Sequence, residues 1–124
     1  PNMESMDINY NCGRLLAVAD AIESWALSAD NEKRATTAIR YFTRFSQYPC
    51  ETWGIITNRL NIYKQKLGGR AKKYTDMIAE ISARIDSNEF AKLKNLDGRM
   101  ALGFDSQRQY ILSTIKKSKE NEED

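Results

Sequence analysis

The sequence predicts an all-α protein, a compact bundle of about five helices in a single domain that spans residues 1–124. Apolar residues recur at spacings of three and four along almost the whole chain, which is the period of an amphipathic helix. Only two prolines and six glycines interrupt the 124 residues, and this length suits one domain. With 41% hydrophobic and 29% charged residues, the chain can bury a core and keep a charged surface.

The first two helices are predicted over residues 8–28 and 33–45. One apolar stripe runs along the first of them (Ile8, Cys12, Leu15, Ala19, Ile22 and Ala26). Residues 28–31 have the composition of a turn. Ile39, Phe42 and Phe45 continue the helical spacing and predict the shorter second helix.

Three further helices are predicted over residues 49–67, 70–86 and 95–117. Pro49 suits the first turn of the third helix, and Gly68 with Gly69 should end it. Residues 87–93 are expected to form a connection with room for one helical turn, and Asn95 is the expected N-cap of the last helix. The core should therefore span residues 8–117, followed by a frayed acidic tail at 118–124.

Composition weighs against an enzyme and predicts no metal and no cofactor. The chain has no histidine, which removes Ser-His and Cys-His catalysis and makes an ordinary zinc site improbable. Its two cysteines show no CxxC spacing. A nuclease would need a carboxylate cluster, but Asp76, Glu80 and Asp86 are scattered around one helix. Without an apolar run of about 18 residues or a signal peptide, the chain is expected in the cytoplasm, away from membranes.

Positive charge is concentrated in residues 33–73, which we call the basic segment. It contains a single acid, Glu51, so its charge is +9 and the rest of the chain carries −7, for a net +2. Its ten cations are Lys33, Arg34, Arg40, Arg44, Arg59, Lys64, Lys66, Arg70, Lys72 and Lys73. A block of one sign indicates a polyanionic partner when its members share a face.

The spacing of these cations predicts phosphate contacts in a nucleic acid. Arg59 and Lys66 are seven residues apart and share a helix side, and Arg40 with Arg44 forms a second ridge. The glycine turn at 68–69 should leave backbone N–H groups for a phosphate at the next helix start. The predicted phosphate-binding residues are Arg40, Arg44, Arg59, Lys64, Lys66, Arg70, Lys72 and Lys73.

Two other interpretations of the basic segment stay open. Its cations are either ordinary solvated side chains or a docking face for an acidic protein partner. Aromatic residues interleave with them, and bases can stack on such rings for about 1–3 kcal/mol each. Phe42, Trp53 and Tyr63 lie on apolar stripes and are expected in the core, whereas Tyr41 and Tyr48 fit either role.

Arg108 is predicted in line with apolar residues of the last helix, because Phe104 and Leu112 lie four positions to either side. A buried arginine needs partners, and Asp20 or Glu23 on the first helix could supply them. The favoured interpretation is a clamp between two helices. Contact with nucleic acid or with a neighbouring subunit is the alternative.

Several motifs resemble one known family. They are Gly13-Arg14-Leu15-Leu16-Ala17-Val18, Arg40-Tyr41-Phe42, Gly98-Arg99, Ala101-Leu102-Gly103-Phe104 and Gln107-Arg108-Gln109. Together they are similar to the C-terminal helical domain of the type I-C CRISPR Cascade large subunit, over residues 8–112. The family also makes this segment as a separate small subunit by internal translation initiation. Ser106 stands where the family pattern often has histidine, and Thr43-Arg44-Phe45 where it has small residues, so Arg44 would add to the positive ridge.

The resemblance implies a role without chemistry. Cascade small subunits line the guide RNA, contact the target strand and steady the displaced non-target strand of the R-loop. Base pairing to the guide RNA recognises the target sequence, so such a subunit needs only contacts with the nucleic acid that do not depend on base sequence. Other Cascade subunits and further copies of the chain are the implied protein partners. The motif residues implied as structural or subunit contacts are Gly13, Arg14, Gly98, Arg99, Gln107 and Arg108.

Overall fold

The structure is a computed structural model that describes the backbone of residues 7–123 and the side chains of residues 7–118. Within these residues the regular secondary structure is entirely helical, which confirms the predicted all-α class. The elements are α1 (Ile8–Ala29), α2 (Thr37–Arg40), α3 (Phe42–Gln47), α4 (Pro49–Leu67), the 3₁₀ turn η2 (Gly68–Arg70), α5 (Ala71–Ser82), α6 (Ser87–Lys92) and α7 (Arg99–Glu123).

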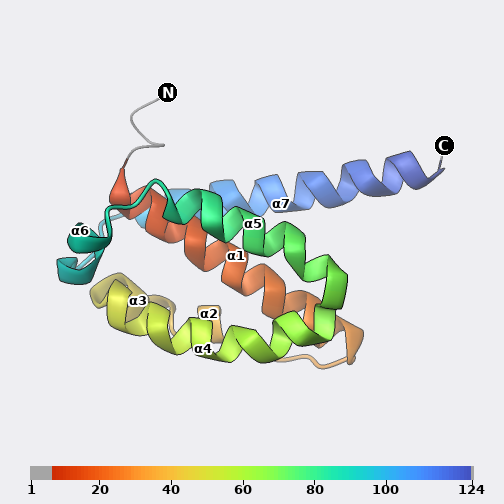
Figure 1. Ribbon diagram of the computed structural model, residues 1–124, viewed down its shortest axis with the longest axis horizontal. Coiled ribbons are helices and arrows are strands. Elements are labelled where there is room, and N and C mark those ends of the chain that lie inside the picture. The colour runs from red at the N-terminus through yellow and green to blue at the C-terminus, as the bar shows by residue number, and fades with distance from the viewer. Residues whose placement is uncertain (1–6, 124) are drawn as a thin grey trace.

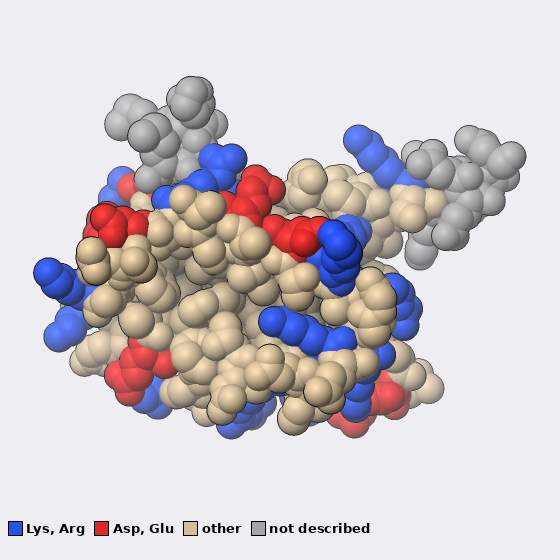
Figure 2. Space-filling view, viewed as in Figure 1, with Lys and Arg blue, Asp and Glu red and all other residues tan. Residues whose placement is uncertain are grey.

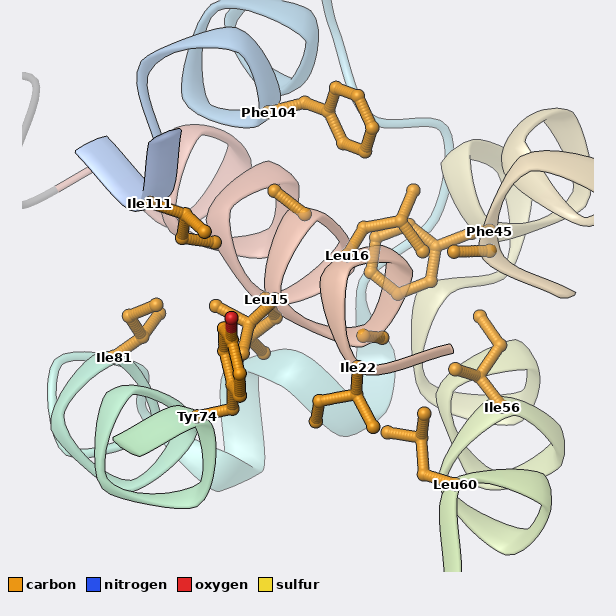
Figure 3. Close-up of a cluster of buried hydrophobic side chains, with 14 of the residues drawn as sticks. Leu15, Leu16, Ile22, Phe45, Ile56, Leu60, Tyr74, Ile81, Phe104 and Ile111 are labelled. Atoms are coloured by element: carbon orange, nitrogen blue, oxygen red, sulfur yellow. The ribbon is translucent and has the colours of Figure 1, made fainter. Parts of the chain in front are cut away.

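Helix α1 forms the centre of the bundle, and the other long helices pack around it (Figure 1). Leu15, Leu16 and Ile22 of α1 meet side chains from α3, α4, α5 and α7 (Figure 3). Cys12 and Val18 are also fully buried on the same helix. A helix that is apolar on nearly every side has to be surrounded, so the sequence of α1 itself explains its central place.

The predicted helix over 33–45 is two short helices, α2 and α3, separated at Tyr41. Two acids of α1 hold the start of α2. Thr36 Oγ1 donates a hydrogen bond to Asp20 Oδ1 at 2.6 Å, and the Thr37 backbone N–H donates to Glu23 Oε1 at 3.0 Å. Thr36 also caps α2 by accepting a hydrogen bond from Ile39 N. These contacts fix where α2 begins, after residues 33–36 of the predicted helix. With the separate break at Tyr41, the prediction of one continuous helix over 33–45 was wrong.

The third helix is confirmed as α4, with Pro49 in its first turn and Gly68 just after its end. Gly68 has φ +59° and ψ −129°, a conformation that is essentially restricted to glycine. The next helix, α5, ends at Ser82 and not at residue 86. Asp86 instead caps a separate helix, α6, by accepting hydrogen bonds from the N–H groups of Asn88 and Glu89. A complete short helix therefore occupies the expected connection.

The last helix starts later and continues further than predicted. Asn95 does not cap it: its φ is +57°, and its N–H donates to the Gln47 carbonyl at 3.0 Å. Asp97 caps the start of the helix instead, since its carboxylate accepts a hydrogen bond from the Arg99 N–H at 2.9 Å. Helix α7 reaches Glu123, through most of the tail expected to fray, and its C-terminal part projects beyond the other helices (Figure 1). Over the described residues, no helix combines the length and apolar character needed to cross a bilayer.

Candidate nucleic-acid interface

The eight predicted phosphate-binding residues lie on consecutive elements of the basic segment. Arg40 is on α2 and Arg44 on α3, the next three are on α4, Arg70 is in η2, and the last two are on α5. Their side chains are exposed, apart from that of Lys64, which is half-buried. The structure therefore leaves them within reach of a ligand. Whether these side chains are free to bind a phosphate depends on whether they already form ion pairs with carboxylates of the chain.

Three of the eight are paired with carboxylates. Arg44 binds Glu51 at 3.0 Å, Lys66 binds Asp30 at 2.5 Å, and Lys72 binds Asp76 at 2.7 Å. The hydrogen bonds to Asp30 and Asp76 raise the pKa of Lys66 and of Lys72. Asp30 and Asp76 lie outside the basic segment in sequence but beside it in space. The charge block is thus partly neutralised by its surroundings.

The other five form no ion pair within the described part of the chain, and three of them (Arg59, Arg70 and Lys73) lie near aromatic rings. The five are Arg40, Arg59, Lys64, Arg70 and Lys73. The Arg59 guanidinium lies 5.7 Å from the centre of the Tyr41 ring, and Tyr41 directly follows Arg40. Arg70 and Lys73 line a hollow together with Trp25. We call these five the unpaired cations.

The cations do not merge into one basic patch on the face drawn in Figure 2. Lysine and arginine side chains stand apart there, several of them against acidic side chains, with uncharged surface between them (Figure 2). Any nucleic acid that follows this surface would meet separate points of positive charge. Separate points of charge can still hold a strand, because each neutralised phosphate releases counterions on its own.

The aromatic side chains divide between core and surface. Phe42 packs edge-to-face on Phe104 with ring centres 5.5 Å apart, and Trp53 packs in the same way on Phe45 at 6.2 Å. Their expected core role is confirmed, as is that of Tyr63, whose ring packs on the core while its hydroxyl accepts a hydrogen bond from Arg34. Tyr48 is exposed and Tyr41 is half-buried beneath Arg59.

Most of the family-like residues lie where α1 meets the first half of α7, a contact that we call the seam. A Cβ atom added to Gly13 would lie 1.9 Å from the Met100 carbonyl oxygen, and one on Gly103 would lie 1.9 Å from that of Tyr10. Each glycine thus admits the backbone of the other helix. Gly98 has open space around it, so no close contact requires glycine there.

Polar side chains of the seam bind one another. Arg14 Nε donates to Gln107 Oε1 at 3.0 Å, and Arg14 Nη1 donates to Asn11 Oδ1 at 3.0 Å. Burial, as the largest influence, lowers the pKa of Arg14. Arg99 forms ion pairs with Asp7 at 2.6 Å and Asp97 at 2.5 Å. The contacts of Arg14 with Gln107 and of Arg99 with Asp7 connect segments that are about 90 residues apart in sequence.

Arg108 is exposed, so the prediction that it is buried was wrong. The anticipated clamp to Glu23 is also wrong, because Glu23 Oε2 accepts from Arg34 Nη1 at 2.8 Å. Asp20 does lie close by: it lines a hollow together with Arg108. Burial raises the pKa of Asp20, while the hydrogen bond from Thr36 and the charge of Arg108 act in the opposite direction. The spacing of four residues predicted Arg108 on the apolar face of the helix, whereas the structure places it at the edge of that face, where its side chain is exposed.

Sequence reasoning missed Trp25. This tryptophan is 36% exposed and borders both the hollow that contains Arg70 and Lys73 and the one that contains Arg108. One signal was available, because Trp25 lies outside the apolar stripe of the first helix. Among the described residues, no three His, Cys, Asp or Glu side chains gather into a group that could hold a metal ion.

Comparison with known proteins gives one family. The model of the family described as CRISPR-associated protein (Cas_Csd1) matches residues 2–112. No curated protein matches the chain, and no solved structure does. Because the family match covers nearly the whole bundle, the chain belongs to the Cas_Csd1 family of CRISPR-associated proteins, a subunit family of the type I-C Cascade complex.

Proposed function

We propose that this chain is a non-catalytic nucleic acid-binding subunit of type I-C Cascade that stabilises the R-loop. It contacts the displaced non-target strand and the backbone of the target strand, beside the guide RNA and other Cascade subunits. We assign it to the separately translated small subunit; the C-terminal domain of the large subunit is the alternative form of the same role. Family membership supports the place in Cascade.

The observation that carries DNA binding is the position of the unpaired cations beside aromatic rings. A strand offers a phosphate and a base in every nucleotide, so a cation next to a ring can use both. Arg59 at Tyr41 and Arg70 with Lys73 at Trp25 provide this combination twice.

The test compares two triple variants that remove equal charge. One variant neutralises unpaired cations (Arg59→Gln, Arg70→Gln and Lys73→Gln). The other neutralises paired ones (Arg44→Gln, Lys66→Gln and Lys72→Gln). Binding of single-stranded DNA of unrelated sequences is measured against salt concentration, and R-loop formation is measured in Cascade reconstituted with each variant.

The unpaired triple should reduce the slope of log affinity against log salt by about 2, since each lost phosphate contact removes about 0.7. R-loop yield should fall with it. The paired triple should change the slope less, because its cations already have carboxylate partners. Equal losses in the two triples would contradict the assignment of the unpaired cations.

A second candidate is docking of an acidic protein partner. The observation in its favour is that Arg44, Lys66 and Lys72 already bind carboxylates in this chain. Polyglutamate of matched charge separates the candidates. If it displaces single-stranded DNA with the same potency as DNA itself, charge alone decides binding and the protein-docking role is favoured.

A further inference from the structure

The hollow between the start of α5 and the C-terminal part of α7 has the composition of a nucleotide site. It has a volume of about 390 Å³, within the range of small-ligand pockets. Apolar or aromatic side chains form one part of its wall (Trp25, Leu67, Tyr74 and Ile115). Arg70 and Lys73 provide its charge, and Gly69 and Ser118 complete the lining. No acidic side chain lines the hollow within the described residues.

Trp25 lines this hollow from α1. Its side chain has no ring contact or hydrogen bond with the rest of the described chain, although the residue is 36% exposed. The other tryptophan, Trp53, packs on Phe45. A partly exposed ring without an aromatic partner is a suitable surface on which a base can stack, since every base has a π-face.

The turn before α5 brings the two cations to the same hollow. Gly68 adopts its glycine-only conformation at the end of α4, and the 3₁₀ turn then leads directly into α5. Lys72 is turned to Asp76, whereas Lys73, the next residue, lines the hollow. Of the two adjacent lysines, Lys72 is held by a carboxylate, whereas the Lys73 Nζ lies 5.6 Å from the centre of the Tyr74 ring, which lines the same hollow. Lys73 thus has no carboxylate partner in the described structure, and a phosphate could pair with its charge.

On its other side, Trp25 borders a second hollow that contains Arg108 and Asp20. A phosphate would meet a cation and a carboxylate together there, so that side offers little net attraction. The two hollows that Trp25 borders therefore differ in charge, and this difference favours the hollow of Arg70 and Lys73 as the one that receives a phosphate.

We propose that the hollow of Trp25, Arg70 and Lys73 binds one nucleotide unit of single-stranded DNA, with the base stacked on Trp25 and the phosphate between Arg70 and Lys73. This inference rests on the proposed DNA-binding function and adds to it a base-dependent contact. A purely electrostatic surface would hold any phosphate chain. This hollow should bind a nucleotide that carries a base more tightly than one without.

The experiment uses the full chain with Trp53→Phe, so that Trp25 is the only tryptophan. Two labelled strands of equal length are titrated at low salt, oligo(dT) and an abasic strand with the same number of phosphates. Anisotropy reports binding, and tryptophan fluorescence reports stacking. Oligo(dT) should bind and quench Trp25, whereas the abasic strand should bind more weakly without quenching.

Side-chain replacements assign the contact. Trp25→Ala should weaken oligo(dT) binding by about 5- to 150-fold and abasic binding little, as expected for one stacked base. Trp25→Phe should retain most of the affinity, and helicity measured by circular dichroism reports that both variants fold. Arg70→Gln should weaken both strands. Arg108→Gln, with the same charge loss, should have a smaller effect.

Two results would overturn the inference and can be told apart. Oligo(dT) that binds as tightly as the abasic strand and leaves Trp25 unquenched would remove the base contact while DNA binding stands. If neither strand binds at low salt, the proposed DNA-binding function fails together with the site.

Discussion

The seam and the unpaired cations of the basic segment use charged side chains in opposite ways. In the seam, Arg14 and Arg99 find their partners within the chain, and the backbones are close enough to exclude a methyl group at Gly13. In the basic segment, Arg70 and Lys73 remain exposed without a carboxylate partner in the described structure. The comparison shows that paired charges help to join α1 and α7, whereas the surface proposed to bind DNA contains charges without a carboxylate partner in the described structure.

Gly13→Ala should break the seam and give the largest loss of stability. The new Cβ would lie 1.9 Å from the Met100 oxygen and 2.9 Å from the Phe104 nitrogen, both backbone atoms that cannot rotate away. We expect a loss of about 3 kcal/mol or more, because the helices must separate, with a melting temperature lower by about 10 °C. Thermal unfolding followed by circular dichroism measures it.

Gly54→Ala is the matched control for that change. Gly54 also lies within a helix, but nothing in the described structure lies within 4 Å of its added Cβ. Alanine should therefore raise stability by about 0.5–1 kcal/mol through helix propensity. If Gly13→Ala raised stability as Gly54→Ala is expected to do, the close approach of α1 and α7 would be disproved.

Glu23→Ala should give the next largest effect, because Glu23 ties the basic segment to the central helix. Its carboxylate is 1% exposed and accepts hydrogen bonds from the Thr37 N–H and from Arg34. Removing it leaves a buried N–H without an acceptor, so we expect a loss of about 2–3 kcal/mol in urea unfolding. The start of α2 should also exchange its amide hydrogens faster.

Glu32→Ala tests whether burial is the cause. Glu32 pairs with the same Arg34 at 3.5 Å, but its side chain is 51% exposed. An exposed ion pair contributes little, so this substitution should change stability by less than about 0.5 kcal/mol. A loss as large as that of Glu23→Ala would mean that Arg34, and not the buried carboxylate, stabilises the segment.

The sequence predicted those elements whose signals are local. The apolar stripe of α1, Pro49 at the start of α4 and the glycines at its end are contained within each helix, and all three predictions are confirmed. The predicted start at residue 33 of the helix over 33–45 was wrong because Asp20 and Glu23, on another helix, fix Thr36 and Thr37. Asn95 was wrong because its backbone pairs with Gln47. Long-range partners decided both outcomes.

The same limit applies to the candidate site. Composition identified the cations of the basic segment, but not which of them a carboxylate holds. Lys66 meets Asp30, 36 residues earlier in the chain, so the absence of acids around it in sequence says nothing about its surroundings in space. Trp25 was missed for the corresponding reason, since only the folded chain brings it to Arg70 and Lys73.

The seam and the basic segment each contain one cysteine, and the two thiols should differ in reactivity. Cys12 is fully buried next to Gly13, whereas Cys50 is exposed. Burial, with smaller contributions from Asp7 and Glu89, raises the pKa of Cys12 to about 12. A thiol reagent at pH 8 should therefore modify one cysteine of the folded protein, and Cys50→Ala should abolish this labelling.

The raised pKa of Cys12 also predicts a loss of stability in alkali, the smallest of these effects at ordinary pH. The folded state holds the thiol proton more tightly than the unfolded state, so this contribution is complete below about pH 9 and decreases as pH rises toward 12. At pH 10.5 it should cost roughly 2 kcal/mol. The experiment compares urea unfolding of the wild type and of Cys12→Ala at pH 8 and at pH 10.5, because lysines and tyrosines titrate alike in the two proteins.

Between pH 8 and 10.5, the wild type should lose that amount of unfolding free energy relative to Cys12→Ala. A constant difference would mean that solvent reaches Cys12, and that the core around α1 is less tightly closed than its side chains indicate.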